Sequence, residues 1–450
     1  MKRNDIVQVL IDDMNFPNIG LGSVNERRLA VKGGLLGQRL SVRIVSKGKK
    51  SKGQIVDVIE PCPDEISPKC QNARLCGGCT FQSIPYECEI KLKTKMVKKV
   101  LAMFDIEDCI LPIVPAINPE RYRNKMEFSF GDDGEPGNLT LGMRKRGSYY
   151  EAINADCCLL CHEDFGRIIR FSLDYFTANG ETFHHKRKNT GTLRHLVIRR
   201  GIVSGEILVN IVTTNKNDYT DYANSLRALE PGLDGRIVGV LHTTCSSVAD
   251  AIVPDEVRVL YGVDYYHEEL NGLRFKVSAF SFFQTNSVMA EKLYGIVSDF
   301  AGDVCDKTVF DLYCGTGTIG IFLARHAKKV IGIEVVGEAV ERAKENAAIN
   351  NINNCEFFAG DVRKVIKDIN DTPDVIVLDP PREGIHPKAI GDILAFKAKC
   401  IVYVSCKATS LQDDLPHFIK AGYMVEKVAI VDMFPRTANV EVVLKLVLAE

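Results

Sequence analysis

The fold is decided by Val309-Phe310-Asp311-Leu312-Tyr313-Cys314-Gly315-Thr316-Gly317-Thr318, an apolar strand pattern that runs into a glycine loop. A helical pattern follows directly, from Ile319 to His326. Glycines let the backbone approach a ligand at the carboxyl end of a strand, where open parallel sheets bind their ligands. Strand and helix patterns alternate from about residue 271 to the end. We therefore expect a mostly parallel sheet with helices on its faces.

An acid follows the next strand of this pattern. Glu334 ends the apolar run that starts at Val330, about 20 residues after the glycine loop, and an acid at that distance can bind ribose hydroxyls. Gly315, Gly317 and Gly320 also satisfy the Gly-x-Gly-x-x-Gly spacing of dinucleotide-binding loops. The spacing alone leaves a nicotinamide dinucleotide and S-adenosylmethionine open as cofactors.

A cysteine stands at the end of a later strand pattern. Cys406 follows the apolar run 401–405, and Glu441 opens the last strand pattern of the chain. Free cysteine usually behaves as a small buried hydrophobe, but a thiol at a strand's carboxyl end can reach a substrate. Methylation of carbon 5 of a pyrimidine needs a thiolate that adds to carbon 6 and a base that removes the carbon 5 proton. Cys406 and Glu441 are the pair that the sequence places at successive strand ends.

The motif Asp379-Pro380-Pro381-Arg382 by itself permits a second chemistry, methylation of an exocyclic nitrogen, which needs no thiol. A wider set of motifs resembles the RNA 5-methyluridine methyltransferases, within the class I S-adenosylmethionine-dependent methyltransferases. The set comprises Asp311–Gly317, Tyr403–Cys406, Asp432–Pro435, Val440-Glu441, Tyr122–Lys125, Leu193–Leu196 and Ser281–Asn286. The resemblance covers essentially the whole chain.

The resemblance implies S-adenosyl-L-methionine as cofactor, Cys406 as nucleophile and Glu441 as base. It assigns the surroundings of the cofactor and the target uracil to Gln284, Tyr313, Gly315, Gly317, Thr318, Glu334, Asp361 and Asp379. The chain departs from the family pattern at three positions, since Lys407 stands for the usual Asn, and Arg436 and Asn439 stand for His residues. A cation such as Lys407 can lower the pKa of a neighbouring thiol, so we expect Lys407 to act on Cys406.

Three domains are expected, namely residues 1–59, 60–270 and 271–450. Short strand patterns at 6–11, 29–31, 40–45 and 54–59, with glycine-containing turns at 18–22, at 33–34 and in the basic segment 47–53, favour a small barrel. The barrel resembles the OB-like TRAM domain, which binds RNA. The second domain is expected to be α+β and the third a Rossmann-like methyltransferase domain. A basic helix is predicted between the barrel and the α+β segment that starts near residue 110. Its apolar face carries Ile90, Val97, Leu101 and Phe104.

A second group of cysteines has the spacing of a metal site. Cys70-x5-Cys76-Gly77-Gly78-Cys79 places three thiols on one loop, and four thiolates can hold zinc or an iron–sulfur cluster. Spacing does not decide between these metals, whereas the family resemblance implies a [4Fe-4S] cluster. It also implies Cys158 as the fourth ligand, with Cys157 as the alternative.

Composition and charge bear on the partner. Residues 1–100 carry 18 Lys and Arg against 10 Asp and Glu, and residues 201–450 carry 25 against 34. This distribution favours an N-terminal module that binds a polyanion, joined to a C-terminal catalytic part. The expected partner is structured RNA, chiefly 23S rRNA, with tRNA as the alternative. The alternative functions are a radical methylthiotransferase and a non-catalytic ribosome-assembly protein that binds RNA. We expect a cytoplasmic protein without a membrane span, and infer no obligate protein partner.

Overall fold

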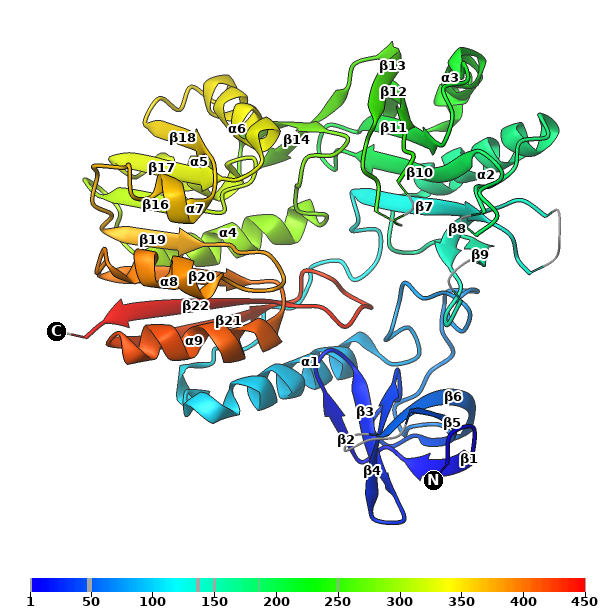
Figure 1. Cartoon of the computed structure of the whole chain (residues 1–450), viewed down its shortest axis with the longest axis horizontal. Coiled ribbons are helices and arrows are strands. Elements are labelled where there is room, and N and C mark those ends of the chain that lie inside the picture. Colours follow the sequence, from blue (N-terminus) through cyan, green and yellow to red (C-terminus); the bar gives the residue numbers. More distant parts are fainter. Residues whose placement is uncertain are drawn as a thin grey trace.

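The computed structural model describes residues 2–46, 51–134, 138–148, 151–185, 187–247, 249 and 251–449. Within them the chain forms three large sheets and a two-stranded one, and Figure 1 shows a barrel-like body, a central body and a C-terminal body. The multidomain α/β class expected from the sequence is confirmed. Lys47–Lys50 of the expected basic turn lie outside the described residues.

The N-terminal body is a six-stranded sheet around an apolar core. Its strand order is β1-β5-β6-β4-β3-β2, and Leu29, Leu40 and Val42 are fully buried inside it. Three of the four expected strand patterns fall within strands, and the first, 6–11, exceeds β1 by one residue. The bounds are β1 (Ile6–Leu10), β2 (Asp13–Asn15), β3 (Ile19–Val24), β4 (Arg27–Lys32), β5 (Arg39–Ser46) and β6 (Ser51–Glu60).

Two expected turns of this body are wrong in part. Residues 51–53 of the expected basic turn are the start of β6. The predicted turn at 18–22 is mostly the start of β3, which runs to Val24. Its glycines serve close packing, since a Cβ on Gly22 would lie 2.3 Å from the carbonyl oxygen of Leu10. A glycine inside a strand marks such a close backbone approach. Glycine is also common in turns, so its presence in the sequence alone does not distinguish the two.

Helix α1 (Tyr86–Leu101) connects the bodies, and the short 3-10 turns η1 (Ala102–Phe104) and η2 (Glu107–Cys109) follow it. Val97 and Leu101 are buried, as the helical spacing predicts. Glu89 and Lys93 are buried as well, with no exposed surface. The helix packs against β2 of the barrel and against α9 (Leu411–Lys420) of the C-terminal body, and Figure 1 shows it between the two.

The central body is a seven-stranded sheet with the order β13-β12-β11-β10-β7-β8-β9. One of its faces buries Phe128, Ile198 and Val209 together with side chains of α2 and α3. The strands are β7 (Lys125–Gly131), β8 (Thr140–Arg144), β9 (Ala152–Asn154), β10 (Leu193–Arg200), β11 (Glu206–Thr213), β12 (Arg236–Thr244) and β13 (Glu256–Gly262). The helices are α2 (Glu163–Ala178), α3 (Thr220–Arg227) and the 3-10 turn η3 (Glu230–Gly232). The hairpin β14 (Tyr265–Leu270) and β15 (Leu273–Ser278) leads to the next body.

The C-terminal body is a seven-stranded sheet with the order β18-β17-β16-β19-β20-β22-β21. Its first five strands are parallel, whereas β22 runs antiparallel to both β20 and β21. The strands are β16 (Thr308–Leu312), β17 (Lys329–Glu334), β18 (Cys355–Ala359), β19 (Val375–Leu378), β20 (Cys400–Ser405), β21 (Tyr423–Val431) and β22 (Glu441–Leu448). The remaining helices are α4 (Ser287–Ala301), α5 (Thr318–Ala324), α6 (Gly337–Ile349), α7 (Val362–Val365), α8 (Pro387–Leu394) and the 3-10 turn η4 (Ala408–Ser410).

This strand order indicates at which edge of the sheet a ligand binds. The chain leaves β16 in one direction toward β17 and in the other toward β19, and such a switch point is where open α/β sheets bind ligands. Because β22 is antiparallel, its first residue, Glu441, lies at the same edge as the carboxyl ends of the parallel strands. None of the helices in the described parts of the chain combines the length and apolar character that a bilayer crossing requires.

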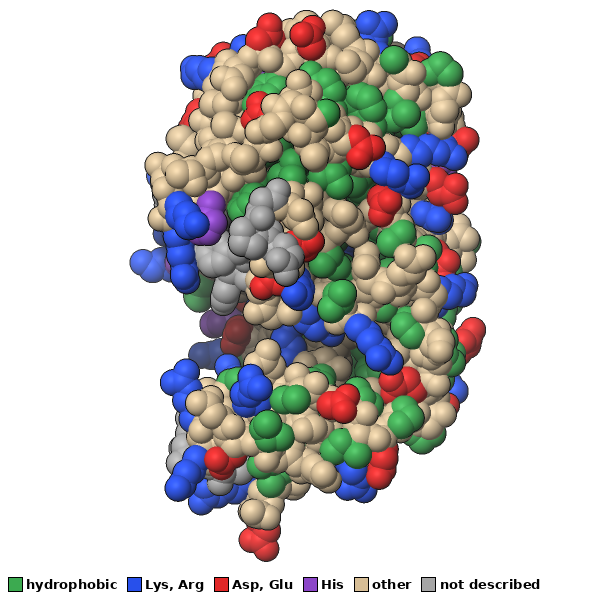
Figure 2. All heavy atoms as spheres, turned by 90° about the vertical axis from the view of Figure 1, so that its right-hand side faces the viewer, with side chains coloured by type: hydrophobic (Ala, Val, Ile, Leu, Met, Phe, Trp, Pro, Cys, Tyr) green, Lys and Arg blue, Asp and Glu red, His purple; other side chains and the backbone are tan. Residues whose placement is uncertain are grey.

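Figure 2 views the molecule from the side of the central body. It shows a recess between the larger upper mass and the smaller lower one, with Lys and Arg side chains on both of its margins. Asp and Glu side chains are visible among them, so the margins of the recess carry charges of both signs.

Candidate active site and cysteine site

A cavity of about 690 Å³ opens at the carboxyl edge of the C-terminal sheet. Both residues of the expected reactive pair line it, together with seven of the eight residues assigned to the cofactor and the target. Those seven are Gln284, Tyr313, Gly315, Thr318, Glu334, Asp361 and Asp379. Gly317 is not part of the lining. It precedes α5 with a φ of 77°, and a Cβ there would lie 2.9 Å from Ala343 and Phe357.

The glycine loop after β16 forms one wall of the cavity. Tyr313 and Gly315 both have positive φ, at 68° and 54°, so the backbone turns sharply toward α5. The Gly315 amide donates to Glu334 Oε2 over 3.1 Å, and the Val336 amide donates to Glu334 Oε1 over 2.9 Å. Glu334 is thereby fixed at the end of β17 with its carboxylate facing the cavity, where the sequence places a group for ribose hydroxyls.

The buried acid Asp311 holds the end of the glycine loop and the start of α5 against β16. Asp311 Oδ2 accepts the Gly320 amide over 2.8 Å, and a Cβ on Gly320 would lie 2.8 Å from that oxygen. The third glycine of the loop therefore lets α5 pack against β16. Burial raises the pKa of Asp311 to about 7.

Cys406 and Glu441 lie beside each other at the sheet edge. Their neighbours Ser405 and Val442 are register partners in the β20–β22 ladder. Glu441 is 2% exposed, and its Oε2 atom has no hydrogen-bond partner. An unpaired buried carboxylate oxygen costs free energy, which is the arrangement expected of an oxygen that serves a substrate rather than the fold.

The charges around the pair are mostly negative. Burial, followed by the carboxylate of Asp379, raises the pKa of Glu441 well above its usual range. Burial, Glu441 and Asp379 raise the pKa of Cys406 to about 12. A thiol with this pKa is protonated near neutral pH.

The cation that opposes this shift is Arg382. It lowers the pKa of both Cys406 and Glu441, and its guanidinium donates to Asn439 Oδ1 over 3.4 Å. Lys407 is not one of the main charges acting on Cys406. The role expected of Lys407 therefore falls to Arg382, because neighbours in sequence need not point into the same cavity.

Some lining residues were not singled out in the sequence. Phe282 is 67% exposed at the cavity, and its place between Ser281 and Phe283 in the expected motif was the available signal. Tyr294 on α4 lines the cavity and lies 3.0 Å from the Thr318 hydroxyl. Nothing in its sequence context indicates this, since only the packing of α4 on the sheet brings it there.

Cysteines from two separate segments of the chain come together beside the central sheet. Cys70, Cys76, Cys79 and Cys158 line a small cavity with apolar walls that include Met126 and Met143. Cys157 is not in this lining, and its sulfur accepts a hydrogen bond from Asn72 over 3.5 Å. The side chain that faces the three loop thiols is therefore that of Cys158, the fourth ligand expected first.

The cysteine loop is held by donors from several directions. The Gly78 amide donates to Cys76 Sγ over 3.3 Å, and the Gln82 amide group donates to Cys79 Sγ over 3.6 Å. Arg146 donates to the carbonyl oxygens of Cys76 and Cys79 over 3.1 and 2.9 Å. N–H donors to sulfur are typical of thiols that carry negative charge when they bind a metal.

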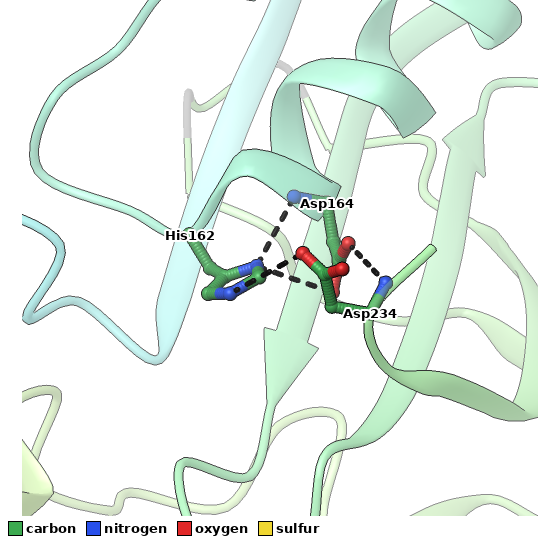
Figure 3. Close-up of side chains that lie close together, drawn as sticks. All are labelled: His162, Asp164 and Asp234. Carbon is green, nitrogen blue, oxygen red and sulfur yellow. Dashed lines mark hydrogen bonds and ion pairs between the residues drawn. The ribbon is translucent and has the colours of Figure 1, made fainter. Parts of the chain in front are cut away.

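A second cluster with metal-ligand chemistry lies on the central body, as Figure 3 shows. Among the described residues, only His162, Asp164 and Asp234 bring three such ligand atoms within 4.8 Å of one another. The Asp164 carboxylate already accepts from Arg167, Arg200 and the amides of Asp234 and Gly235, all within 3.1 Å. The His162 Nδ1 atom accepts the Asp164 amide. This cluster is a network that joins α2 to β10 and β12.

The sequence model of the tRNA (uracil-5-)-methyltransferase family matches residues 202–448. A protein of Caldanaerobacter subterraneus subsp. tengcongensis, named as an uncharacterized RNA methyltransferase, is 46% identical over 98% of this chain and 99% of its own length. A Clostridium tetani protein of the same name is 44% identical over 99% of this chain and 98% of its own length.

The likeness extends to a solved structure. The Pyrococcus abyssi tRNA (uracil-54, C5)-methyltransferase, crystallised in complex with S-adenosyl-L-homocysteine, matches with a TM-score of 0.78 and 26% identity. The match covers 98% of this chain and 99% of that one, so the common architecture includes all three bodies.

Proposed function

Because the chain belongs to the tRNA (uracil-5-)-methyltransferase family, we propose that it methylates carbon 5 of a uridine in structured RNA through a covalent adduct on Cys406. The family makes it an S-adenosylmethionine-dependent RNA uracil-C5 methyltransferase. The observation that carries the covalent route is the pairing of Cys406 with Glu441 in one cavity, where a carboxylate oxygen is buried without a partner.

The residues divide the chemistry between them. The Cys406 thiolate adds to carbon 6 of the uracil, and the electron pair of the 5,6 double bond moves into the ring carbonyl as an enolate. Carbon 5 then takes a methyl group, which S-adenosylmethionine supplies from its sulfonium. Glu441 removes the proton from carbon 5, the bond between carbon 6 and Sγ breaks, and the double bond reforms. The raised pKa of Glu441 gives it the proton affinity that abstraction from carbon requires.

The cavity also fits the cofactor. Glu334 presents a carboxylate for ribose hydroxyls, and Asp361 caps α7 with its side chain at the adenine-facing loop of the family pattern. Gln284 and Asp379 line the same cavity, Asp379 acts on the pKa of Cys406, and both side chains are suited to the uracil. A uridine within folded RNA must leave its stack to enter, at a cost of a few kcal/mol.

We further propose that Cys70, Cys76, Cys79 and Cys158 hold a [4Fe-4S] cluster. All four line one apolar cavity. Two sulfurs that bind one zinc ion at about 2.3 Å each can be at most about 4.6 Å apart. Within the described part of the chain, no three of these sulfurs lie within 4.8 Å of one another. The choice of a cluster over zinc rests on the resemblance of the cysteine loop to that of cluster-binding family members. No step of the methyl transfer passes through this site.

The proposed target is a uridine of 23S rRNA. The cysteine loop supports it, since the family resemblance connects that loop with ribosomal-RNA enzymes, and the Lys and Arg side chains on the margins of the recess in Figure 2 suit a large polyanion. A tRNA uridine is the second candidate, favoured by the Pyrococcus abyssi structure, whose name gives tRNA as its substrate. Family membership and the paired reactive groups favour either enzyme over a radical methylthiotransferase or a non-catalytic assembly protein.

The test is to map 5-methyluridine in ribosomal and transfer RNA from cells with and without this gene, and to restore it with the purified protein. Loss of one 5-methyluridine from 23S rRNA is the expected result. Loss from tRNA alone would transfer the proposal to the second candidate. Unchanged RNA in both fractions, with no methylation in vitro, would overturn it.

A further inference from the structure

The segment that presents Glu441 is tied to the cysteine site by a buried polar network. This connecting segment, residues 432–440, joins β21 to β22. In Figure 1 it is the red loop that reaches from the C-terminal sheet toward the other two bodies. The Arg436 carbonyl oxygen accepts the amides of Thr80 and Phe81 over 2.7 and 3.1 Å. Thr80 directly follows Cys79, so one peptide unit separates a proposed metal ligand from the connecting segment.

The Arg436 side chain adds a second connection. Its guanidinium donates to the Ile84 carbonyl oxygen over 3.1 Å and to that of Phe81 over 3.5 Å. The Arg436 amide donates to Glu89 Oε1 over 2.7 Å, and the guanidinium lies 3.6 Å from Glu89 Oε2. Arg436, a residue of the connecting segment, therefore contacts both the residues directly after the cysteine loop and helix α1.

The charges continue through α1 to the start of the segment. Lys93 pairs with Glu89 and with Asp432, each over 2.7 Å, and all three side chains are fully buried. Tyr86 donates to the other oxygen of Asp432 over 2.7 Å. Two cations and two anions are thus buried together. Such a network contributes little net stability but is strongly position-specific, because removal of one partner leaves a buried charge unpaired.

The backbone of Arg436 shows that its position is imposed. Its φ is 64°, a left-handed conformation that is unfavourable for a residue other than glycine. Strain of this kind persists where the surroundings over-determine the conformation. Here the surroundings are α1 and the residues directly after the cysteine loop, and the consequence is a fixed path for the five residues that lead to Glu441.

We propose that Arg436 is a positioning residue that ties the cysteine loop to the segment presenting Glu441, so that an intact cysteine site and correct placement of the base depend on each other. The inference rests on the proposed function of Glu441 and of the cysteines. Arg436 touches neither substrate nor metal in this scheme. It acts through the main chain of the connecting segment.

The test uses Arg436→Gly, which removes the guanidinium and relieves the left-handed backbone, so the full-length protein should fold. Arg121→Gly is the matched control. Arg121 also has a positive φ, of 57°, and donates to the carbonyl oxygens of Cys158 and Cys161. Among the described residues the Arg121 side chain contacts Cys158, Cys161 and Glu163, so the substitution removes no direct contact with the connecting segment. The neighbouring Tyr122, which donates to the Pro435 carbonyl oxygen over 3.0 Å, is kept. Wild type and variants are compared at equal iron content per chain.

RNA with tritium on carbon 5 of uridine separates the two steps. Adduct formation needs Cys406, whereas tritium release needs Glu441. In Arg436→Gly the ratio of tritium release to trapped adduct should fall about tenfold, while Arg121→Gly keeps the wild-type ratio and Arg436→Lys recovers part of it. An unchanged ratio in Arg436→Gly would overturn the inference. Wild-type protein that releases no tritium would instead count against the proposed function.

Hydrogen exchange gives a second readout that needs no turnover. Exchange of the 433–441 peptide should accelerate in Cys79→Ser, and exchange at 79–82 should accelerate in Arg436→Gly, because each segment holds the other. If each variant affects only its own segment, the coupling is absent and the inference fails.

Discussion

The two cysteine sites that we propose give the same side chain two different roles, and their surroundings differ accordingly. Cys406 lies in a cavity of about 690 Å³ beside two carboxylates. The four cysteines of the other site line a cavity of about 30 Å³ with methionine and aliphatic walls. A substrate needs room and a base, whereas a ligand set needs neither. The neighbours of a thiol thus indicate its role better than its own exposure does.

Removing the thiol of the larger site tests the difference between the two cysteine sites with the largest expected effect. Cys406→Ala should abolish both methyl transfer and the covalent adduct with 5-fluorouridine RNA, with a loss of about 10⁴-fold or more in rate. The measurement is methyl incorporation alongside a denaturing gel for the adduct. Cys400→Ala is the control, because Cys400 begins the same strand and is buried at its opposite end. It should keep the activity, and equal losses in both variants would mean that Cys406 is structural.

The base of the larger site gives the next largest effect. Glu441→Gln keeps the size of the side chain but cannot take the carbon 5 proton. Turnover should fall about 10²–10⁴-fold, and the protein should accumulate as an adduct with natural uridine RNA. Quantifying that adduct checks the assignment. A variant that neither turns over nor forms adduct would show that Glu441 acts before the proton-removal step.

The smaller site is tested by a pair of neighbouring cysteines. Cys158 lines its cavity whereas Cys157 accepts a hydrogen bond from Asn72. Cys158→Ser should lower iron per chain roughly tenfold or more, because metal binding here is coupled to loop folding. Cys157→Ser should leave it near the wild-type value. Iron and sulfide analysis of anaerobically purified protein measures both, and zinc in place of iron would contradict the cluster.

Much of the larger site follows from the sequence because its residues are local to strand ends. The end of a β-strand fixes Glu334, Asp379 and Cys406 on one edge once the sheet is known to be parallel. Glu441 is on that edge for a different reason. It begins a strand that runs antiparallel, and a strand pattern in the sequence does not give its direction.

The sequence was less informative where groups meet across long distances in the chain. Fully buried Glu89 and Lys93 look like ordinary members of a charged helix, and their partner Asp432 lies more than 300 positions away. In the sequence the glycines of β3 look like a turn, and only the three-dimensional structure shows the backbone that packs against them. In each case the partner is supplied by tertiary packing, which residue patterns do not contain.

The last comparison concerns how acids and cations set the reactivity of the larger site, and its smallest effect is that of a single cation. With a pKa of about 12, the Cys406 thiol is almost wholly protonated near neutral pH, and its thiolate fraction rises about tenfold for each unit of pH below that value. Alkylation of Cys406 by iodoacetamide, followed on its peptide by mass spectrometry, should rise accordingly from pH 7 to pH 9.

The same measurement separates the two candidate cations. Because Arg382 lowers the pKa of Cys406, Arg382→Ala should raise that pKa and slow alkylation at pH 8 by about threefold. Lys407→Ala, the neighbour in sequence, should leave the rate unchanged. Equal slowing in both variants would restore Lys407 as a partner of the thiol. A rate independent of pH would mean that the acids around Cys406 do not suppress its ionisation, and the electrostatic contrast between the two cysteine sites would fail.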